Sequence, residues 1–210
     1  MKLFDISVPI SNTTHVYKDD IPIQVQKNVS IIDSGSINAS TLSMSSHSGT
    51  HIDAPFHFFN NGKKIDEIDT EIFIGYTYVI EILDHESQIT TKHLKNIVIP
   101  SNISKILFKT NNSKLWSKNK FQANFTSISI NVAEWLISKN IQLVGIDYLS
   151  VDSSHTTTFP IHKKLLKNNI IILEGLDLSE ISEGIYTLIC FPLKITSGDG
   201  SPARAMLIKD

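Results

Sequence analysis

Hydrophobic and polar residues alternate along most of this chain in patterns that predict short strands. Residues 3–10 alternate loosely, and residues 72–83 and 103–110 are rich in Ile, Val, Tyr and Phe. Such side chains suit a pleated, half-buried surface, so we expect all three segments to be strands. Further strands are predicted at residues 39–46, 141–147, 170–173, 185–195 and 203–208.

The spacing of apolar residues changes to a helical period after residue 130. Apolar side chains recur at helical spacing over residues 131–139, with Asn131 as a cap and Asn140 as the end of the helix. Residues 160–167 predict a second helix, which begins with a proline and ends at two asparagines. A short helix is also expected at 90–96.

The strand at 141–147, the helix at 160–167 and the strand that follows form a strand–helix–strand unit. Such units build parallel or mixed sheets, whose ligands gather beyond the carboxyl ends of the strands. Asp147 and Glu174 occupy two such ends. We therefore predict an α/β fold with a mixed sheet and few helices, and neither a repeat nor a linker divides residues 1–210, so we expect a single domain.

Composition narrows the classes of function. With a net charge of −2 and a single arginine, Arg204, the chain lacks the basic surface that nucleic-acid binding requires. It has no long apolar run and no signal-like start, so we expect no membrane segment and a cytoplasmic location. Cys190 is the only cysteine, which excludes a disulfide within the chain and fits a reducing compartment.

Residues 47–57 stand out because they place three histidines and an aspartate in eleven positions. The whole chain has eight histidines, so an even scatter would leave less than one in this window. Pro55 excludes helix at the preceding residue, and Gly49 allows a sharp turn, so a strand end that runs into a loop is expected.

In such a loop His47, His51 and Asp53 can converge on one point, with His57 a little further away. Imidazole and carboxylate are ligands that suit Zn²⁺ or Mn²⁺, and three protein ligands leave a position open for water. The alternative is that these histidines only cap backbone groups of the loop.

The run His-x-Gly-Thr-His-x-Asp-x-Pro-x-His resembles the signature of the cyclase family of metal-dependent hydrolases, which includes bacterial kynurenine formamidases and isatin hydrolases. The resemblance covers nearly the whole chain. It continues through Gly145-Ile146-Asp147, His162, Glu174-Gly175-Leu176 and the segment from Gly198 to Ala205.

The resemblance implies a swivelling β/β/α domain and a complete metal site. In that site His47, His51 and Asp53 hold one metal, Asp53 bridges, and His162 with Glu174 holds or shares a second. One or two Zn²⁺ ions are implied, with Mn²⁺ as the alternative. Without the resemblance, His162 would be assigned as a structural histidine and Glu174 as an ordinary carboxylate at a strand end.

His57 is the one histidine of the motif left over, and we expect it to move protons between water and a leaving nitrogen. The alternative is that it is a further ligand. Family members usually carry an aromatic-Pro-Gly-Asp turn where this chain has residues 17–20, Tyr-Lys-Asp-Asp. Tyr17 is therefore expected to contact the substrate, on a turn that is less fixed, unless it only packs on its own domain.

The resemblance implies a hydrolase that cleaves an amide bond of a small, aromatic molecule with a metal-activated water, most like kynurenine formamidase. The alternatives are a hydrolase that opens lactam or lactone rings, as isatin hydrolases do, and a metal-binding module without turnover. A homodimer or homotetramer is implied as well, in which the loop with the aromatic residue reaches towards a neighbouring subunit.

The remaining polar residues carry weaker expectations. Asp199 and Arg204 could line the site, but we favour a role in fixing the turn at residues 198–202. His155 lies in a polar loop and is not assigned to the site. His85 and His93 have no partner motif and are expected to be exposed to solvent.

Overall fold

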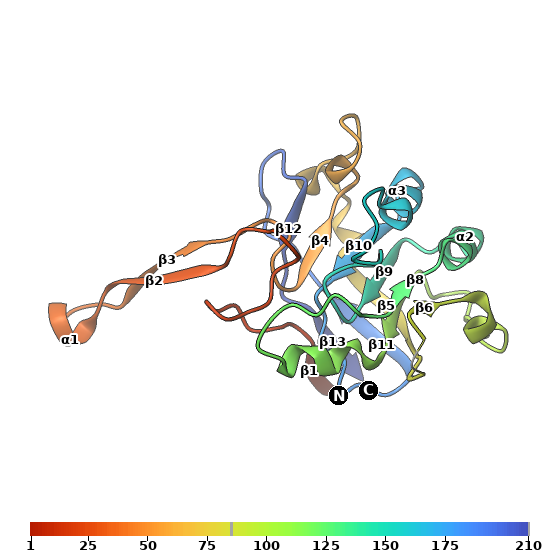
Figure 1. The fold of residues 1–210 in the computed structure, drawn as a ribbon, viewed down its shortest axis with the longest axis horizontal. Coiled ribbons are helices and arrows are strands. Elements are labelled where there is room, and N and C mark those ends of the chain that lie inside the picture. Colours follow the sequence, from red (N-terminus) through yellow and green to blue (C-terminus); the bar gives the residue numbers. More distant parts are fainter. Residues whose placement is uncertain (85, 210) are drawn as a thin grey trace.

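The centre of the fold is a curled mixed sheet of nine strands (Figure 1). The computed structural model describes residues 1–84 and 86–209. Across the sheet the strands follow the order β1 (Lys2–Asp5), β13 (Met206–Lys209), β11 (Gly184–Ile189), β5 (Ile74–Glu81), β7 (Lys105–Lys109), β9 (Leu143–Ile146), β10 (Ile171–Glu174), β4 (His51–Asp53) and β12 (Gly200–Pro202). The four strands from β5 to β10 are parallel, and all other neighbours are antiparallel.

Two helices, α2 (Ile130–Ser138) and α3 (Pro160–Lys167), lie side by side on one face of the parallel strands (Figure 1). They bury Leu136, Leu165 and other apolar side chains against those strands, and a second apolar cluster fills the opposite face. Because α3 connects the parallel strands β9 and β10, the predicted strand–helix–strand unit is confirmed. No helix in the described part of the chain is long and apolar enough to cross a membrane.

Short elements connect these parts. A second small sheet pairs β6 (Gln88–Ile89) with β8 (Ser127–Ile128) in parallel. The 3₁₀ helices are η1 (Pro55–His57), η2 (Ile65–Glu67), η3 (Thr70–Phe73), η4 (Thr91–Leu94) and η5 (Asn111–Ser117). The helix predicted at residues 90–96 is therefore a single 3₁₀ turn.

Several predicted boundaries are wrong. Helix α2, predicted to begin after Asn131, begins at Ile130. The carbonyl of Ser129 already accepts hydrogen bonds from the amides of Val132 and Ala133. The predicted turn at 198–202 contains strand β12, because these residues pair with β4. The first strand ends early, since the Val8 amide bonds to the Thr50 side chain instead of a neighbouring strand.

A hairpin arm, defined here as residues 24–43, projects from the body of the protein (Figure 1). It consists of β2 (Gln24–Val29), the one-turn helix α1 (Ile31–Ser34) and β3 (Ala39–Ser43), with β2 and β3 antiparallel. The predicted strand at 39–46 is correct in type, but it belongs to this arm and leaves Leu42 54% exposed. The sequence pattern did not predict β2.

Strand pairing decides which side chains meet at the end of the sheet. Strand β4 lies between β10 and β12, and its residue His51 pairs directly with Glu174. Directly paired residues, and residues two apart on one strand, point to the same face. The pairing therefore places the side chains of His51, Asp53 and Glu174 on the same face of the sheet.

Gly175 follows this junction and makes it possible. Its φ is +71°, and a Cβ atom there would lie 1.9 Å from the carbonyl oxygen of Gly49. The β10 end can therefore lie against the turn before β4 only because residue 175 has no side chain. Gly35, in the hairpin arm, has the same φ of +71° but open space around it.

This pair of glycines gives a matched test of the close contact. Gly175→Ala should lower the free energy of unfolding by about 2 to 5 kcal/mol, because strain and a backbone clash add, whereas Gly35→Ala should lower it by about 1 kcal/mol from strain alone. Urea unfolding of both variants measures the difference. Equal effects of the two substitutions would contradict the role given to the Gly49–Gly175 contact.

Candidate metal centre

All five predicted metal ligands converge at the edge of the sheet. His51 and Asp53 come from β4, Glu174 ends β10, His162 lies in the first turn of α3, and His47 lies in the turn before β4. Their ligand atoms form two groups, one of His47, His51 and Asp53 and one of Asp53, His162 and Glu174, and within each group the atoms lie within 4.8 Å of one another. Asp53 belongs to both groups, as the bridging role requires.

Two of the histidines are oriented by hydrogen bonds at Nδ1. His51 Nδ1 donates to the carbonyl oxygen of Gly49 at 2.9 Å, and His162 Nδ1 donates to Asp152 Oδ2 at 2.7 Å. Each bond leaves Nε2 as the free nitrogen. The free nitrogens point at the carboxylates, with His51 Nε2 3.4 Å and His162 Nε2 3.1 Å from Glu174. Hydrogen bonds of this kind fix the tautomer that a metal-binding histidine needs.

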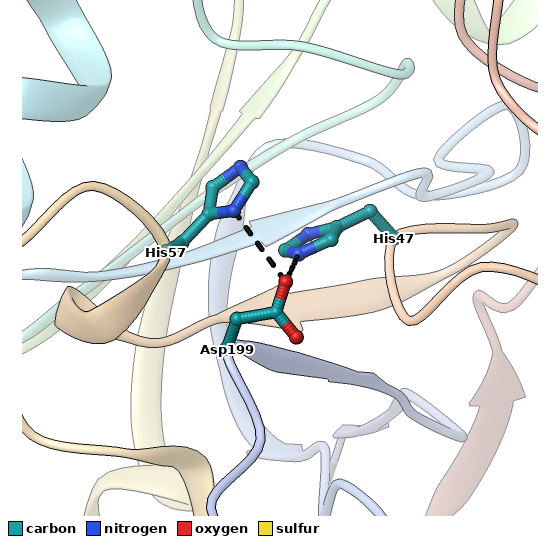
Figure 2. A group of neighbouring side chains, drawn as sticks. All are labelled: His47, His57 and Asp199. Carbon is teal, nitrogen blue, oxygen red and sulfur yellow. Dashed lines mark hydrogen bonds and ion pairs between the residues drawn. The ribbon is translucent and has the colours of Figure 1, made fainter. Parts of the chain in front are cut away.

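His47 has the opposite orientation. Its Nε2 donates to Asp199 Oδ2 at 2.9 Å (Figure 2). Its Nδ1 faces Asp53 Oδ1 at 2.7 Å. Gly200 makes room for this ring, because a Cβ atom at that position would lie 2.6 Å from His47 Cε1. Asp199 therefore does more than fix a turn, and the role favoured for it from the sequence was incomplete.

His57 lies outside these two ligand groups, but it forms a third possible ligand group with His47 and Asp199. Its ring stacks on that of His47 with centroids 3.9 Å apart, and its Nδ1 lies 3.7 Å from Asp199 Oδ2 (Figure 2). Burial lowers the pKa of His57. The ring is 30% exposed and faces the cavity described below, so it can reach both solvent and a bound molecule.

The centre buries two carboxylates, Asp53 and Glu174, whose ion pairs within the described residues are all with histidines. Asp53 is 1% and Glu174 3% exposed, and no Lys or Arg within residues 1–84 and 86–209 forms an ion pair with either. Burial alone would raise the pKa of Asp53, but the neighbouring His47 holds it well below its usual value. Burial alone would lower the pKa of His47, but Asp53 and Asp199 outweigh it and raise the pKa to about 10.

These observations fit a divalent cation. Asp53 Oδ2 is buried and has no hydrogen-bond partner within the described residues, which is costly for a carboxylate oxygen. Without a metal, protons on His47 and His162 balance the two carboxylates, since both histidines have raised pKa values. A divalent cation bound between the two groups would supply that positive charge and release the protons. Mixed imidazole and carboxylate donors suit Zn²⁺ and related metals.

The centre forms the floor of a cavity of about 430 Å³. Tyr17, Phe58, Leu149 and Phe159 give it an apolar and largely aromatic wall. Phe159 has a φ of +48°, a backbone conformation that strains a bulky residue, and it directly precedes α3. One strained residue thus belongs to the cavity wall and directly precedes the helix that carries His162.

Other polar residues singled out from the sequence lie away from the centre. The exposed Arg204 pairs with Asp5, and the exposed His155 contacts Asn124. Asp147 is buried but accepts hydrogen bonds from Thr110 and Ser113, which gives it a structural role.

His93 is only 11% exposed, so the prediction of a solvent-exposed side chain is wrong; His85 lies outside the described residues. His93 forms a possible ligand group with Asp84 and Glu86. However, its Nδ1 accepts a hydrogen bond from the Thr90 amide, so its Nε2 carries the proton and donates to Asp84. Both ring nitrogens of His93 are therefore used in hydrogen bonds at the start of η4, and we assign the group a capping role.

Sequence reasoning missed Asp152. It is 2% exposed and accepts hydrogen bonds from the amides of Ile161 and His162 as well as from the His162 ring. One carboxylate thus caps α3 and orients a ligand. The only signal in the sequence was an acidic residue beside apolar Leu149 and Val151, which is too weak to assign a role.

Comparisons with known proteins agree with this arrangement. The family model described as "Putative cyclase" matches residues 4–153. A relative from Bacillus thuringiensis subsp. konkukian (strain 97-27), named kynurenine formamidase, is 37% identical over 203 residues, which cover 97% of this chain and 95% of the relative.

Two solved structures share the fold. One, described as a predicted metal-dependent hydrolase from Bacillus stearothermophilus, is 30% identical with a TM-score of 0.83, covering 98% of this chain and 97% of that one. The other, isatin hydrolase A from Labrenzia aggregata bound to benzyl benzoate, has a TM-score of 0.86 at 23% identity, covering 100% and 94%. The motif, the sheet and these matches together show that the chain belongs to the cyclase family.

Proposed function

We propose that this protein is a metal-dependent hydrolase that cleaves the amide bond of an aryl formamide, with N-formylkynurenine as the leading candidate. The observation that carries the proposal is the pair of ligand groups sharing Asp53 on the floor of an aromatic cavity. The relative named kynurenine formamidase supports the choice of substrate, because the similarity extends over nearly the whole of both chains.

We assign the first ligand group, His47, His51 and Asp53, to one metal and the second, Asp53, His162 and Glu174, to another. Zn²⁺ is the proposed metal, with one or two ions per subunit, and Mn²⁺ is the alternative. When bound, such an ion polarises a carbonyl and lowers the pKa of water from about 15.7 towards roughly 7.

We propose that His57 transfers protons during the reaction. It accepts a proton from the attacking water as the water oxygen bonds to the formyl carbon. It then donates that proton to the amide nitrogen as the carbon–nitrogen bond breaks, which leaves a free aryl amine and formic acid, and the acid releases its remaining proton to solvent to give formate. Asp199 lies next to His57 Nδ1 and His47 Nε2, so it can hold both rings in place.

The cavity wall is proposed to select aromatic substrates. Tyr17 and Phe58 line the same cavity as the ligand groups and offer aromatic rings to a substrate there, and stacking contributes about 0.5 to 1.5 kcal/mol beyond burial. Burial and the nearby charge of Glu174 raise the pKa of Tyr17, which lines the same cavity as the ligand groups. We infer that Tyr17 contacts the substrate close to the bond that breaks.

We also propose that the chain assembles into a homodimer or homotetramer through the hairpin arm. An isolated two-stranded hairpin is marginal in water, and this one exposes Ile32 by 91%, Ile37 by 56% and Leu42 by 54%. Its apolar tip extends away from the body (Figure 1), where a second copy could cover it.

Metal content and turnover together separate a ligand from the proton carrier. His51→Ala should reduce both, because it removes a ligand, whereas His57→Ala should retain metal and lower kcat by roughly 10² to 10⁴. Metal analysis and assays on N-formylkynurenine measure this, with His155→Ala as the control. A chelator should abolish activity, and Zn²⁺ or Mn²⁺ should restore it.

Full activity in metal-free protein would exclude the proposed function. Loss of metal from His57→Ala would make His57 a ligand instead of the proton carrier. Assays with a panel of lactams alongside aryl formamides show whether ring opening is the preferred reaction.

Substitutions of Tyr17 test the substrate contact. Tyr17→Phe should be mild because the ring face remains, whereas Tyr17→Ala should raise KM for N-formylkynurenine by roughly 3- to 30-fold with little change in kcat, the pattern of lost uniform binding. Steady-state kinetics measure both constants. A fall in kcat of several orders with unchanged KM would instead place Tyr17 among the groups that take part in the reaction.

Light scattering tests the proposed assembly. At micromolar concentration the protein should be a dimer or tetramer, and Ile32→Asp combined with Ile37→Asp should shift it towards monomer, because charges at the tip of the hairpin arm oppose burial. Circular dichroism should remain unchanged, since both side chains are exposed in the single chain. A wild-type protein that is monomeric throughout would refute the assembly.

A further inference from the structure

His15 is a buried histidine that none of the roles above uses. It is 6% exposed and lies two residues before Tyr17. Its Nε2 donates to the carbonyl oxygen of Lys118 at 2.7 Å, which leaves Nδ1 to accept from the Tyr148 hydroxyl at 3.4 Å. Its ring stacks on Trp116 with centroids 5.7 Å apart.

The partners of His15 are themselves fixed to the body of the protein. Trp116 Nε1 donates to the carbonyl oxygen of Leu176 at 2.9 Å, and the Tyr148 hydroxyl accepts from the Gln122 amide at 3.0 Å. Leu176 follows the ligand Glu174 by two residues, and Tyr148 directly precedes residues 149–150, which line the cavity. His15 thus links the Tyr17 loop, defined here as residues 15–20, to the segments that carry Glu174 and residues 149–150 of the cavity wall.

The turn after Tyr17 is closed but strained. The amide of Asp20 donates to the carbonyl oxygen of Tyr17 at 3.0 Å, which closes a turn over residues 17–20. Asp19 has a φ of +65°, a left-handed conformation that favours glycine. With neither proline nor glycine to preset it, the turn needs contacts from outside to hold this conformation.

Those contacts come from the same segment that binds His15. The Tyr17 ring packs edge-on against the Phe121 ring, with the two ring centroids 5.5 Å apart. Phe121 lies close in sequence to Lys118 and Gln122. The Tyr17 loop therefore touches residues 116–122 at two points, through a hydrogen-bonded imidazole and through an aromatic ring.

We propose that His15 is a positioning residue that holds Tyr17 in the cavity wall before substrate binds. The inference rests on the proposed substrate contact of Tyr17. A ring that is already in place loses less conformational freedom on binding, so it contributes more to affinity. The two ring nitrogens of His15 bond to Lys118 and Tyr148, and His15 does not line the cavity, so it contacts no reacting atom in this assignment.

His15→Phe tests the proposal, because it keeps an aromatic ring next to Trp116 and removes both hydrogen bonds. Amide hydrogen exchange without substrate should become faster at residues 17–20 and stay unchanged in β9 and β10. KM for N-formylkynurenine should rise roughly 3- to 10-fold, the effect of one or two lost hydrogen bonds, with kcat within about 2-fold. His15→Gln can still donate to Lys118 and should remain close to wild type, and His155→Phe is the matched control.

A double-mutant cycle separates positioning from a general structural role. In the Tyr17→Ala background, His15→Phe should change KM by less than about 2-fold, because the ring that His15 positions is absent. Unchanged exchange in His15→Phe, faster exchange throughout the sheet, or the same rise in KM with and without Tyr17 would each overturn the proposal.

The same experiment distinguishes this proposal from the proposed function. If Tyr17→Ala leaves KM unchanged, the substrate contact is wrong, while hydrogen exchange still reports whether His15 holds the loop. If Tyr17→Ala raises KM and His15→Phe changes neither KM nor exchange, the contact stands and the positioning role of His15 is wrong.

Discussion

The buried carboxylate of Asp53 is the constraint on which the site depends. It sits in the middle of β4, shared by two ligand groups, with one oxygen that no hydrogen bond satisfies within the described chain. Folding must therefore bring compensating groups to it or leave a costly buried charge. The three imidazoles around it provide part of that compensation, and the rest matches what a divalent cation supplies.

Much of this arrangement could be predicted from the sequence, but not all of it by the same route. His47, His51 and Asp53 are close along the chain, so their spacing alone indicated convergence. His162 and Glu174 were assigned only through the family resemblance. Their approach to Asp53 depends on the pairing of β4 with β10 and on the crossover through α3, and neither has a local signal.

Two contacts of the site were not predicted, that of Asp199 with His47 and that of Asp152 with His162. Asp199 reaches His47 because β12 pairs with β4, and Asp152 reaches His162 because it caps α3. Strand β2 of the hairpin arm escaped prediction because residues 24–29 contain only two apolar side chains and face no core. Binary patterns report burial in a single chain, so an element that is exposed there leaves little trace in them.

Both ends of the hairpin arm join segments that line the cavity. Residues 18–20 precede it, and Ser45 and His47 follow it. The arm is thus connected at both of its ends to the rim of the cavity. Coupling between two binding events is reciprocal. A contact at the tip of the arm that favours one shape of the cavity rim raises the affinity for a ligand that prefers this shape. The bound ligand then strengthens the contact by the same factor. Quaternary structure and substrate affinity would then both depend on one equilibrium between shapes of the cavity rim.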